Sequence, residues 1–144
     1  LRFFTVYGKF GRPDMALFKF TEAILKNKKA QIYNNGNHQR DFTHIDDVTN
    51  KIFQLINKPN VKKNYQIFNI ASGKSNHLKN FIKLIEKYTN KKLKIINLSK
   101  QKGDIVKTHA DITKINKYLN DNHSTSLKNG INNFIKWYRE YYKL

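Results

Sequence analysis

Cysteine is absent from this chain of 144 residues, and proline, methionine and tryptophan are scarce, with two, one and one copies. Without cysteine there is neither a disulfide framework nor a thiolate metal site, which suits a reducing cytoplasm. No apolar run approaches the ~18 residues of a membrane span, and no signal peptide opens the chain. We therefore expect one cytoplasmic domain with a hydrophobic core and no membrane contact.

Acidic residues are also few: ten Asp and Glu stand against 28 Lys and Arg, a net charge of +18. Such an excess is typical of nucleic-acid binding. Here it is almost all Lys, spread along the chain among many Asn and Ile, without a zinc-finger spacing, an RNP-like aromatic motif or a basic-leucine heptad. We interpret the charge as compositional bias, and specific nucleic-acid binding is not expected.

The scarcity of Arg makes the few arginines informative. Only Arg2, Arg12, Arg40 and Arg139 are present. Where Lys is the default cation, an Arg suggests a position that needs a planar, bidentate fork. Arg12 and Arg40 lie in stretches rich in turn residues, where a ligand anion would be met.

The hydrophobic pattern predicts an α/β chain. Strands are expected over residues 1–6, 31–33, 65–71 and 92–98, and helices over residues 15–26, 46–57, 78–88, 111–119 and 125–142, with Pro59 and Asn60 closing the second helix. The stretches 1–6 and 65–71 are apolar without polar alternation, so they are predicted to be buried on both faces, as in a parallel sheet.

Residues 39–48 (QRDFTHIDDV) place an Arg–Asp pair beside an aromatic and directly before a helical pattern. Asp46 or Asp47 would cap that helix, because a carboxylate accepts otherwise unpaired backbone N–H groups. Two interpretations of the pair stay open. Arg40 stands at a strand-to-helix junction and faces an anion, or Arg40 and Asp41 form a surface ion pair.

The sequence gives little support for a metal site, a dinucleotide-binding loop or a catalytic Tyr/Lys pair. The five histidines show no metal-binding spacing and are each expected on the surface or in a loop; they are His38, His44, His77, His109 and His123. Gly8 and Gly11 match the start of a dinucleotide-binding loop, but Asp14 replaces its third glycine. Tyr88 and Lys92 have a Tyr-x-x-x-Lys spacing at the end of a Lys-rich helix, which we attribute to chance.

Three motifs carry a family resemblance. Residues 1–8 (LRFFTVYG), 11–16 (GRPDMA) and 39–47 together resemble the extended short-chain dehydrogenase/reductase family, and within it the bacterial UDP-glucuronate 4-epimerases, the capsular-polysaccharide nucleotide-sugar epimerases. Gly103-Asp104 and residues 137–142 (WYREYY) fit the C-terminal end of this group. The resemblance covers essentially the whole chain. The Gly-Arg-Pro-Asp-Met-Ala motif is specific to the group, whereas Arg-Asp-Phe is shared with other sugar epimerases and dehydratases.

The resemblance implies a two-part NAD-dependent isomerase of capsule or lipopolysaccharide biosynthesis. In the family an N-terminal Rossmann domain binds NAD through a Gly-rich loop and carries the catalytic Tyr-x-x-x-Lys, while the C-terminal part binds the nucleotide sugar. NAD takes hydride from C4 and returns it to the other face. Neither the loop nor a credible Tyr/Lys pair is found here, and the chain opens without Met. Residues 1–144 are therefore expected to be the C-terminal substrate-binding region without the N-terminal NAD-binding domain, inactive alone and not holding NAD.

The same resemblance assigns the sugar end of the site. Thr5 and Arg12 match positions near the hexuronate carboxylate, and a guanidinium fork suits a carboxylate better than an ammonium does. Lys19 is a candidate second cation there. Arg40 matches the arginine that holds the diphosphate.

At the nucleotide end, Tyr33 with Ile32 matches the segment that lines the uracil pocket, and Asp104 matches the acid near the ribose hydroxyls. No catalytic or metal-binding residue is assigned. Two alternatives stay open: part of another nucleotide-sugar enzyme, of the UDP-glucose 4-epimerase or dTDP-glucose 4,6-dehydratase type, or a non-catalytic basic remnant that binds anionic polymers.

The expected partners are a UDP sugar and an N-terminal Rossmann half, if that half is separately encoded, with a homodimer forming when the enzyme is complete. In the family the stretches 1–6 and 65–71 would complete the Rossmann sheet. In this chain alone they are expected to lie near one another at the edge of the fold, poorly covered on one side. Unpaired edges and apolar patches of this kind promote association.

Overall fold

The computed structural model describes residues 1–58 and 65–144. In chain order the elements are β1 (Arg2–Phe3), β2 (Thr5–Tyr7), α1 (Ala16–Leu25), β3 (Lys29–Tyr33), the 3₁₀ turn η1 (Asn34–Gly36), β4 (Gln39–His44), α2 (Ile45–Ile56), β5 (Asn69–Ile70), β6 (Ser75–His77), α3 (Leu78–Thr89), β7 (Lys94–Leu98), α4 (Thr113–Leu119) and α5 (Leu127–Tyr141). The predicted α/β class is confirmed. The predicted helix closure at Pro59 and Asn60 lies outside the described residues.

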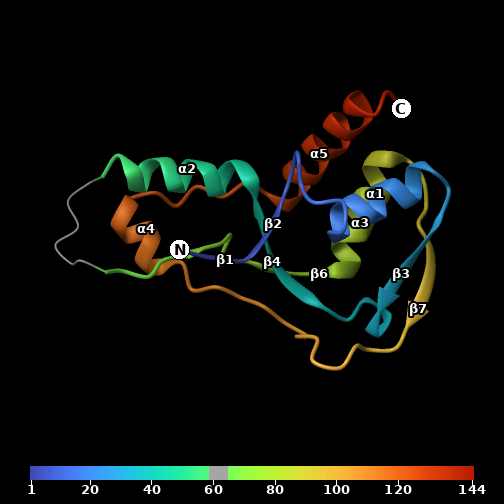
Figure 1. The fold of residues 1–144 in the computed structure, drawn as a ribbon, viewed down its shortest axis with the longest axis horizontal. Helices are drawn as coiled ribbons and strands as arrows, with labels where there is room; N and C mark the ends of the chain where they lie inside the picture. The colour runs from blue at the N-terminus through green and yellow to red at the C-terminus, as the bar shows by residue number, and fades with distance from the viewer. Residues whose placement is uncertain (59–64) are drawn as a thin grey trace.

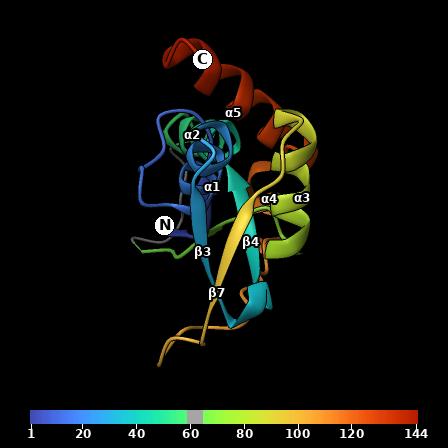
Figure 2. The ribbon, with the colours of Figure 1, turned by 90° about the vertical axis from the view of Figure 1, so that its right-hand side faces the viewer.

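Within the described residues the strands form three small sheets. β4 is central to the largest: β2 lies parallel to it on one side, and β6 lies antiparallel on the other. β1 pairs in parallel with β5, and β3 with β7. Figure 2 shows β3 and β7 running side by side. The central strand therefore carries Arg40 between elements from distant parts of the chain.

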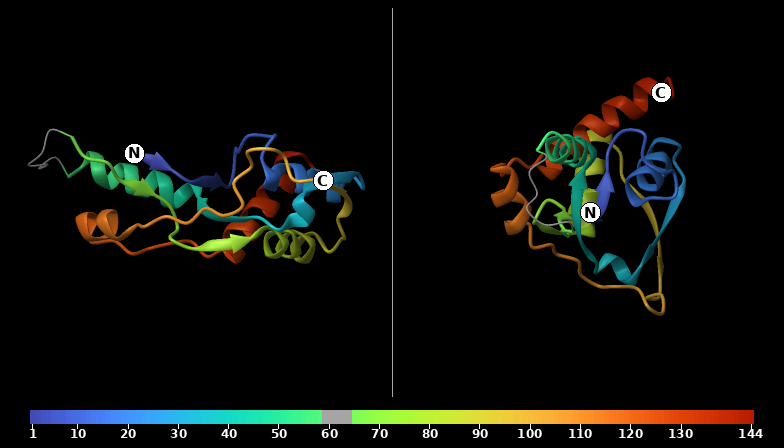
Figure 3. Two further views of the ribbon diagram at one scale, coloured as in Figure 1. Left: turned by 90° about the horizontal axis from the view of Figure 1, so that it is seen from below. Right: turned by 60° about the vertical axis from the view of Figure 1, so that its left-hand side comes forward.

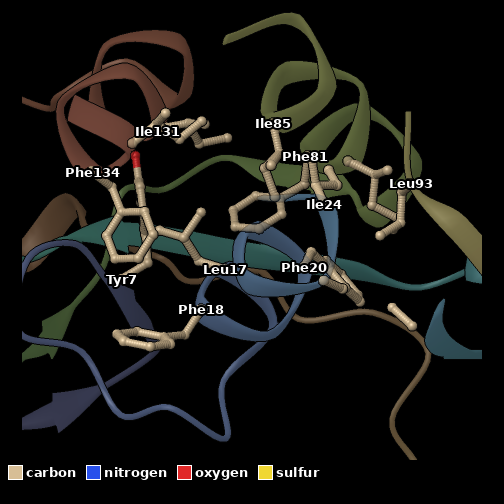
Figure 4. Packing of buried hydrophobic residues seen from close by; sticks show 14 of the residues in the cluster. Tyr7, Leu17, Phe18, Phe20, Ile24, Phe81, Ile85, Leu93, Ile131 and Phe134 are labelled. Carbon is tan, nitrogen blue, oxygen red and sulfur yellow. The ribbon is translucent and has the colours of Figure 1, made fainter. Parts of the chain in front are cut away.

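The molecule is elongated, with α2 and α4 at one end and α1, β3 and β7 at the other (Figures 1 and 3). Each end has its own hydrophobic cluster. The larger cluster joins α1, α3, α5 and β3 (Figure 4). In it Phe42 of β4 stacks on Phe81 of α3 with ring centroids 4.2 Å apart. The smaller cluster packs Phe68 and Ile70 against α2 and α4. β4 runs between the two clusters.

The closing helix α5 shows how the sequence encodes this packing. Its buried side chains include Ile131, Phe134, Ile135 and Tyr138, which recur at the three- and four-residue spacing of one helix face. Trp137 is partly buried and packs against the same cluster. Among the described residues, no helix is long and apolar enough to cross a bilayer.

The N-terminal stretch 1–6 departs from the prediction. It divides at Phe4: Arg2 and Phe3 pair with β5, and the next three residues pair with β4 instead. Leu1 is 52% exposed and Phe3 51% exposed. The prediction that this stretch is buried on both faces is therefore wrong, because none of residues 1–6 is buried and both residues of β1 are exposed.

The stretch 65–71 is also shorter as a strand than predicted. Only Asn69 and Ile70 form β5, whereas Tyr65 is 79% exposed and residues 65–68 have no regular structure. Arg2 lies opposite Asn69, and Phe3 opposite Ile70, so the two stretches do lie side by side. Their predicted proximity and incomplete cover are confirmed.

Candidate functional site

Arg40 on β4 is held by three acceptors. Its Nη1 donates to the backbone oxygens of Gln39 at 3.0 Å and Val106 at 3.3 Å, and its Nη2 donates to Oδ1 of Asp104 at 2.9 Å. Three of the five guanidinium N–H donors thus have partners among the described residues. The side chain keeps 23% of its surface exposed. The fork is fixed in direction and can still meet an anion.

His38 lies beside this ion pair and is only 5% exposed. Its Nε2 is 2.9 Å from Oδ2 of Asp104, although the N–H is not aligned with that oxygen as a hydrogen bond requires. The distance from Nε2 to Oδ2 tells more than the orientation of the N–H, because the broad χ2 torsion of a histidine lets the ring turn at little cost. The Asp104 carboxylate therefore lies between His38 and Arg40.

Asp41, the next residue along β4, is fully buried and faces a different environment. Its Oδ1 accepts hydrogen bonds from the backbone N of Ser72 at 2.9 Å and from the Ser72 hydroxyl at 2.7 Å. Its Oδ2 accepts from the backbone N of Gly73 at 3.1 Å and of Ala110 at 3.3 Å. The surface Arg40–Asp41 ion pair is therefore the wrong interpretation. Asp41 joins two loops to β4, and one of them belongs to the segment that carries Asp104.

An open cleft lies beside Arg40, with an empty volume of about 910 Å³ including its solvent-filled mouth. Its lining includes six of the seven residues assigned from the resemblance, namely Thr5, Lys19, Ile32, Tyr33, Arg40 and Asp104. They come from β2, α1, β3, β4 and the segment before α4. These six residues thus bring two cations, one carboxylate and one aromatic ring to a common space, which Asp14, Phe20 and Phe42 also line.

Arg12 does not line this cleft. Its side chain is 73% exposed and forms an ion pair with Asp14 at 2.8 Å. It lines a neighbouring hollow with an empty volume of about 380 Å³, which shares Thr5, Met15 and Phe42 with the cleft. The structure therefore places Arg12 next to the cleft and paired with a carboxylate of its own loop.

The start of α2 differs from the prediction that Asp46 or Asp47 caps it. The helix begins at Ile45, and its cap is His44, whose Nδ1 accepts a hydrogen bond from the backbone N of Asp46 at 3.3 Å. Asp47 accepts instead from the backbone N and hydroxyl of Thr125, at 2.8 and 2.7 Å. Both acids still lie in the first turn, where the helix dipole favours negative charge. Asp47 fixes the approach of the chain to α5.

The prediction that each histidine lies on the surface or in a loop is wrong at His44, which ends β4 and is buried, whereas His38 does lie in the loop between η1 and β4. His38 and His44 are buried, with 5% and 2% exposure, whereas the other three are exposed. His38 could have been noticed because residues two apart project to the same side of an extended chain, and Arg40 lies two residues further on. No local signal indicates the burial of either ring, since both are covered by residues distant in sequence.

Two buried tyrosines serve packing. Burial raises the pKa of Tyr7 well above its ordinary value, and the charge of Asp47 raises it further. Burial, with a smaller contribution from Glu22, raises the pKa of Tyr138 to about 12. Both hydroxyls therefore stay protonated near neutral pH and are unsuited to proton exchange there.

Neither a metal centre nor a dinucleotide site is built by the described residues. They contain no group of three or more His, Asp or Glu side chains that could hold a metal ion. A Cβ added at Gly8 would lie 2.5 Å from Cγ2 of Ile45, so the space beside this glycine is filled by a side chain. Lys92 pairs with Glu86 at 2.8 Å on the surface. Gly8 therefore leaves no open space for a dinucleotide phosphate at this turn, and Lys92 is engaged by a carboxylate.

Fold and site together define the class: an α/β chain with an open cleft lined by cations, carboxylates and aromatic rings. Comparison with known proteins agrees. The family described as NAD dependent epimerase/dehydratase matches residues 1–71. The resemblance to that family, seen first in the sequence motifs, is confirmed.

Three known proteins show which members of the family this chain resembles. MJ1055 of Methanocaldococcus jannaschii is 46% identical over 140 residues, which are 97% of this chain and 42% of that protein. The UDP-glucuronate 4-epimerase of Thermodesulfobacterium geofontis is 36% identical over 97% of this chain and 42% of its own length. The crystal structure of the Bacillus cereus UDP-glucuronic acid 4-epimerase with UDP-glucuronic acid and NAD superposes with a TM-score of 0.88 and 30% identity, over 98% of this chain and 45% of that one. The chain thus spans less than half the length of these relatives.

Proposed function

We propose that this chain supplies the nucleotide-sugar site of an NAD-dependent UDP-sugar 4-epimerase whose substrate is UDP-glucuronate. The observation that carries the proposal is the cleft beside Arg40, which gathers residues from five separate parts of the chain around one fixed guanidinium. The similarity to UDP-glucuronate 4-epimerases supports the choice of substrate.

At the nucleotide end, each proposed role follows from the chemistry of the side chain. The remaining N–H groups of Arg40 hold the diphosphate, since a guanidinium binds phosphate oxygens through two parallel hydrogen bonds. Tyr33, with Ile32, lines the uracil pocket, where an aromatic ring offers a stacking face. Asp104 accepts from the ribose hydroxyls with the lone pairs that Arg40 leaves free.

The sugar end is proposed to lie where the cleft meets the hollow that contains Arg12. Thr5 lines both spaces and belongs to β2, so it can donate a hydroxyl hydrogen bond to the hexuronate. Lys19 adds a positive charge to the cleft wall. Arg12 reaches the carboxylate only if it exchanges its Asp14 partner for the ligand.

The hydride chemistry is proposed to belong to a separate NAD-binding half, because the space beside Gly8 is filled by Ile45 and Lys92 is paired with Glu86. In this chain the side chains bind and orient the sugar nucleotide and take no part in hydride transfer. Residues 1–144 then form a single substrate-binding region. The expected setting is the cytoplasm, in the supply of sugar for capsule or lipopolysaccharide.

A second candidate is part of an enzyme for another nucleotide sugar. It is favoured by one observation, the exposed position of Arg12 and its pairing with Asp14. Without Arg12 the site retains its diphosphate and nucleotide contacts, which all nucleotide sugars share. The two candidates differ in whether the hexuronate carboxylate adds affinity.

Titration calorimetry of the purified chain with UDP-glucuronate and UDP-glucose tests the proposal. Arg40→Ala should weaken both ligands tenfold or more, because a charge-assisted hydrogen bond is worth roughly 1.5–3 kcal/mol. Arg12→Ala should weaken UDP-glucuronate alone, since only that ligand offers a carboxylate. The matched control is Arg2→Ala, which removes an exposed arginine outside the cleft and should change neither affinity.

Three outcomes would contradict parts of the proposal. Absence of binding of either ligand to the unchanged chain would refute a nucleotide-sugar site. Equal losses for both ligands in Arg12→Ala would remove the reason for naming glucuronate. Turnover of UDP-glucuronate by the purified chain would refute the need for a separate NAD-binding half.

A further inference from the structure

His38 is a titratable side chain enclosed next to the ion pair of the proposed nucleotide site. Its Nε2 is 2.9 Å from Oδ2 of Asp104, while the other oxygen of that carboxylate accepts from Arg40 at 2.9 Å. At this separation a positive charge on the ring would interact directly with the carboxylate. The ring is either neutral or, when protonated, an imidazolium ion.

We infer that His38 is a positioning residue of the nucleotide site, acting through Asp104, and that its protonation increases affinity for a nucleoside diphosphate sugar. This inference rests on the proposed function. Protonation strengthens the attraction between His38 and Asp104, and so loosens the hold of that carboxylate on Arg40. It also adds one positive charge near the phosphates. Both effects favour an anionic ligand.

Other charged groups surround this corner, and their effects must be separated from that of His38. They are Asp14 and Lys19 near the start of α1, Tyr33 on β3, His77 on β6, Lys79 on α3 and Lys107 opposite Gln39. Lys79 donates to the side chain of Asn37 at 2.9 Å, next to His38 in the chain. Of these groups, His77 is the other histidine, and histidine is the side chain whose charge ordinarily changes between about pH 5 and pH 8.

The burial of His38 gives it a role that the exposed histidines lack. Its backbone oxygen accepts from the backbone N of Leu78 at 2.9 Å, which fixes the residue against the start of α3. Because the ring is only 5% exposed, it cannot turn away from Asp104 into solvent. The charge of protonated His38 therefore acts on the Asp104 carboxylate more strongly than the charge of a solvent-exposed group would.

The test is the affinity of the full chain for UDP-glucose, measured by calorimetry at about pH 6 and about pH 8. UDP-glucose is chosen because its diphosphate is esterified at both ends, and so lacks the terminal phosphate ionisation near pH 6. Affinity should be roughly threefold to tenfold higher at the lower pH. His38→Gln, which keeps a neutral N–H donor, should remove most of this dependence. His77→Gln, a matched change at an exposed histidine, should retain it.

A measurement on the unchanged chain covers the case in which His38→Gln does not fold. Binding and protonation are reciprocal, so saturating UDP-glucose should increase the protonated fraction of His38 at about pH 7, seen in the NMR signals of its ring. The inference fails if that fraction is unchanged or falls, or if the pH dependence persists in folded His38→Gln. If UDP-glucose does not bind the unchanged chain at either pH, the proposed function fails as well, which separates the two failures.

Discussion

Arg40 and Asp41 are adjacent in the chain, yet their side chains point to opposite faces and have different roles. Successive residues of a strand point to opposite faces, so Arg40 reaches the cleft while Asp41 points into the protein. The buried carboxylate is compensated by four hydrogen bonds shorter than 3.4 Å from Ser72, Gly73 and Ala110. A buried charge is tolerated only with such partners. Asp41 is therefore a structural residue that fixes the loops around the cleft.

Asp41→Asn should lower the free energy of unfolding by roughly 2–3 kcal/mol. The amide has the same shape, but its NH2 group would face backbone N–H donors where an acceptor is required. Urea unfolding followed by circular dichroism measures the loss. Asp46→Asn is the matched control at a carboxylate whose side chain is 74% exposed. It should cost less than about 1 kcal/mol, the scale of a charge at a helix N-terminus. Equal effects of the two changes would show that the Asp41 hydrogen bonds are not needed.

At the scale of elements, α5 approaches β2 and β4 at a glycine. A Cβ added to Gly130 would lie 2.8 Å from Cδ2 of His44 and would overlap the hydroxyl of Tyr7. The Tyr7 hydroxyl points toward α5 (Figure 4), and it has no hydrogen-bond partner among the described residues. The helix therefore packs as closely as it does because residue 130 has no side chain.

Gly130→Ala should destabilise the fold by roughly 1–3 kcal/mol, the usual cost of overpacking a core, even though alanine favours a helix over glycine. Tyr7→Phe removes an unpaired buried hydroxyl, so alone it should be neutral or stabilising by about 1 kcal/mol. Combined with Gly130→Ala it should restore part of the lost stability, because the overlapping oxygen is gone. Thermal unfolding of the two single variants and the double variant measures the coupling. Strict additivity would contradict the contact.

At the scale of the whole molecule, β1 is a strand edge with exposed apolar side chains, at which another chain can associate. Within the described residues β1 pairs on one side only, and Leu1 and Phe3 are about half exposed, at 52% and 51%. An apolar strand edge can pair with another chain. The proposed NAD-binding half would cover this edge, and a second copy of the chain can do so in its absence.

The chain should therefore associate as its concentration rises, and sedimentation velocity should show it. Phe3→Lys should reduce association by charging the edge of β1, with little change in stability, since surface substitutions usually stay within about 0.5 kcal/mol. Phe53→Lys is the matched control: it changes a phenylalanine that is 67% exposed on α2, away from β1, and should leave association unchanged. A monomer at every concentration, or equal effects of the two changes, would show that β1 is not the associating edge.

The sequence alone determined what depends on neighbouring residues. Periodicity located α1, α2, α3, α4 and α5 because a helix face repeats every three to four residues, and the retained arginines singled out Arg40. The family resemblance carried by the motifs also indicated six residues of the cleft lining, from Thr5 to Asp104. These signals lie in neighbouring residues and can be found without knowledge of the fold.

Only the tertiary structure decided which groups meet across long distances in the chain. Arg40 pairs with Asp104, 64 residues away, rather than with Asp41 beside it. His38 is buried because that distant segment covers it, and its own neighbours give no sign of this. The apolar pattern of residues 1–6 likewise could not show whether a sheet covers both sides. Burial and pairing are properties of the assembled fold, since they depend on which segments pack together.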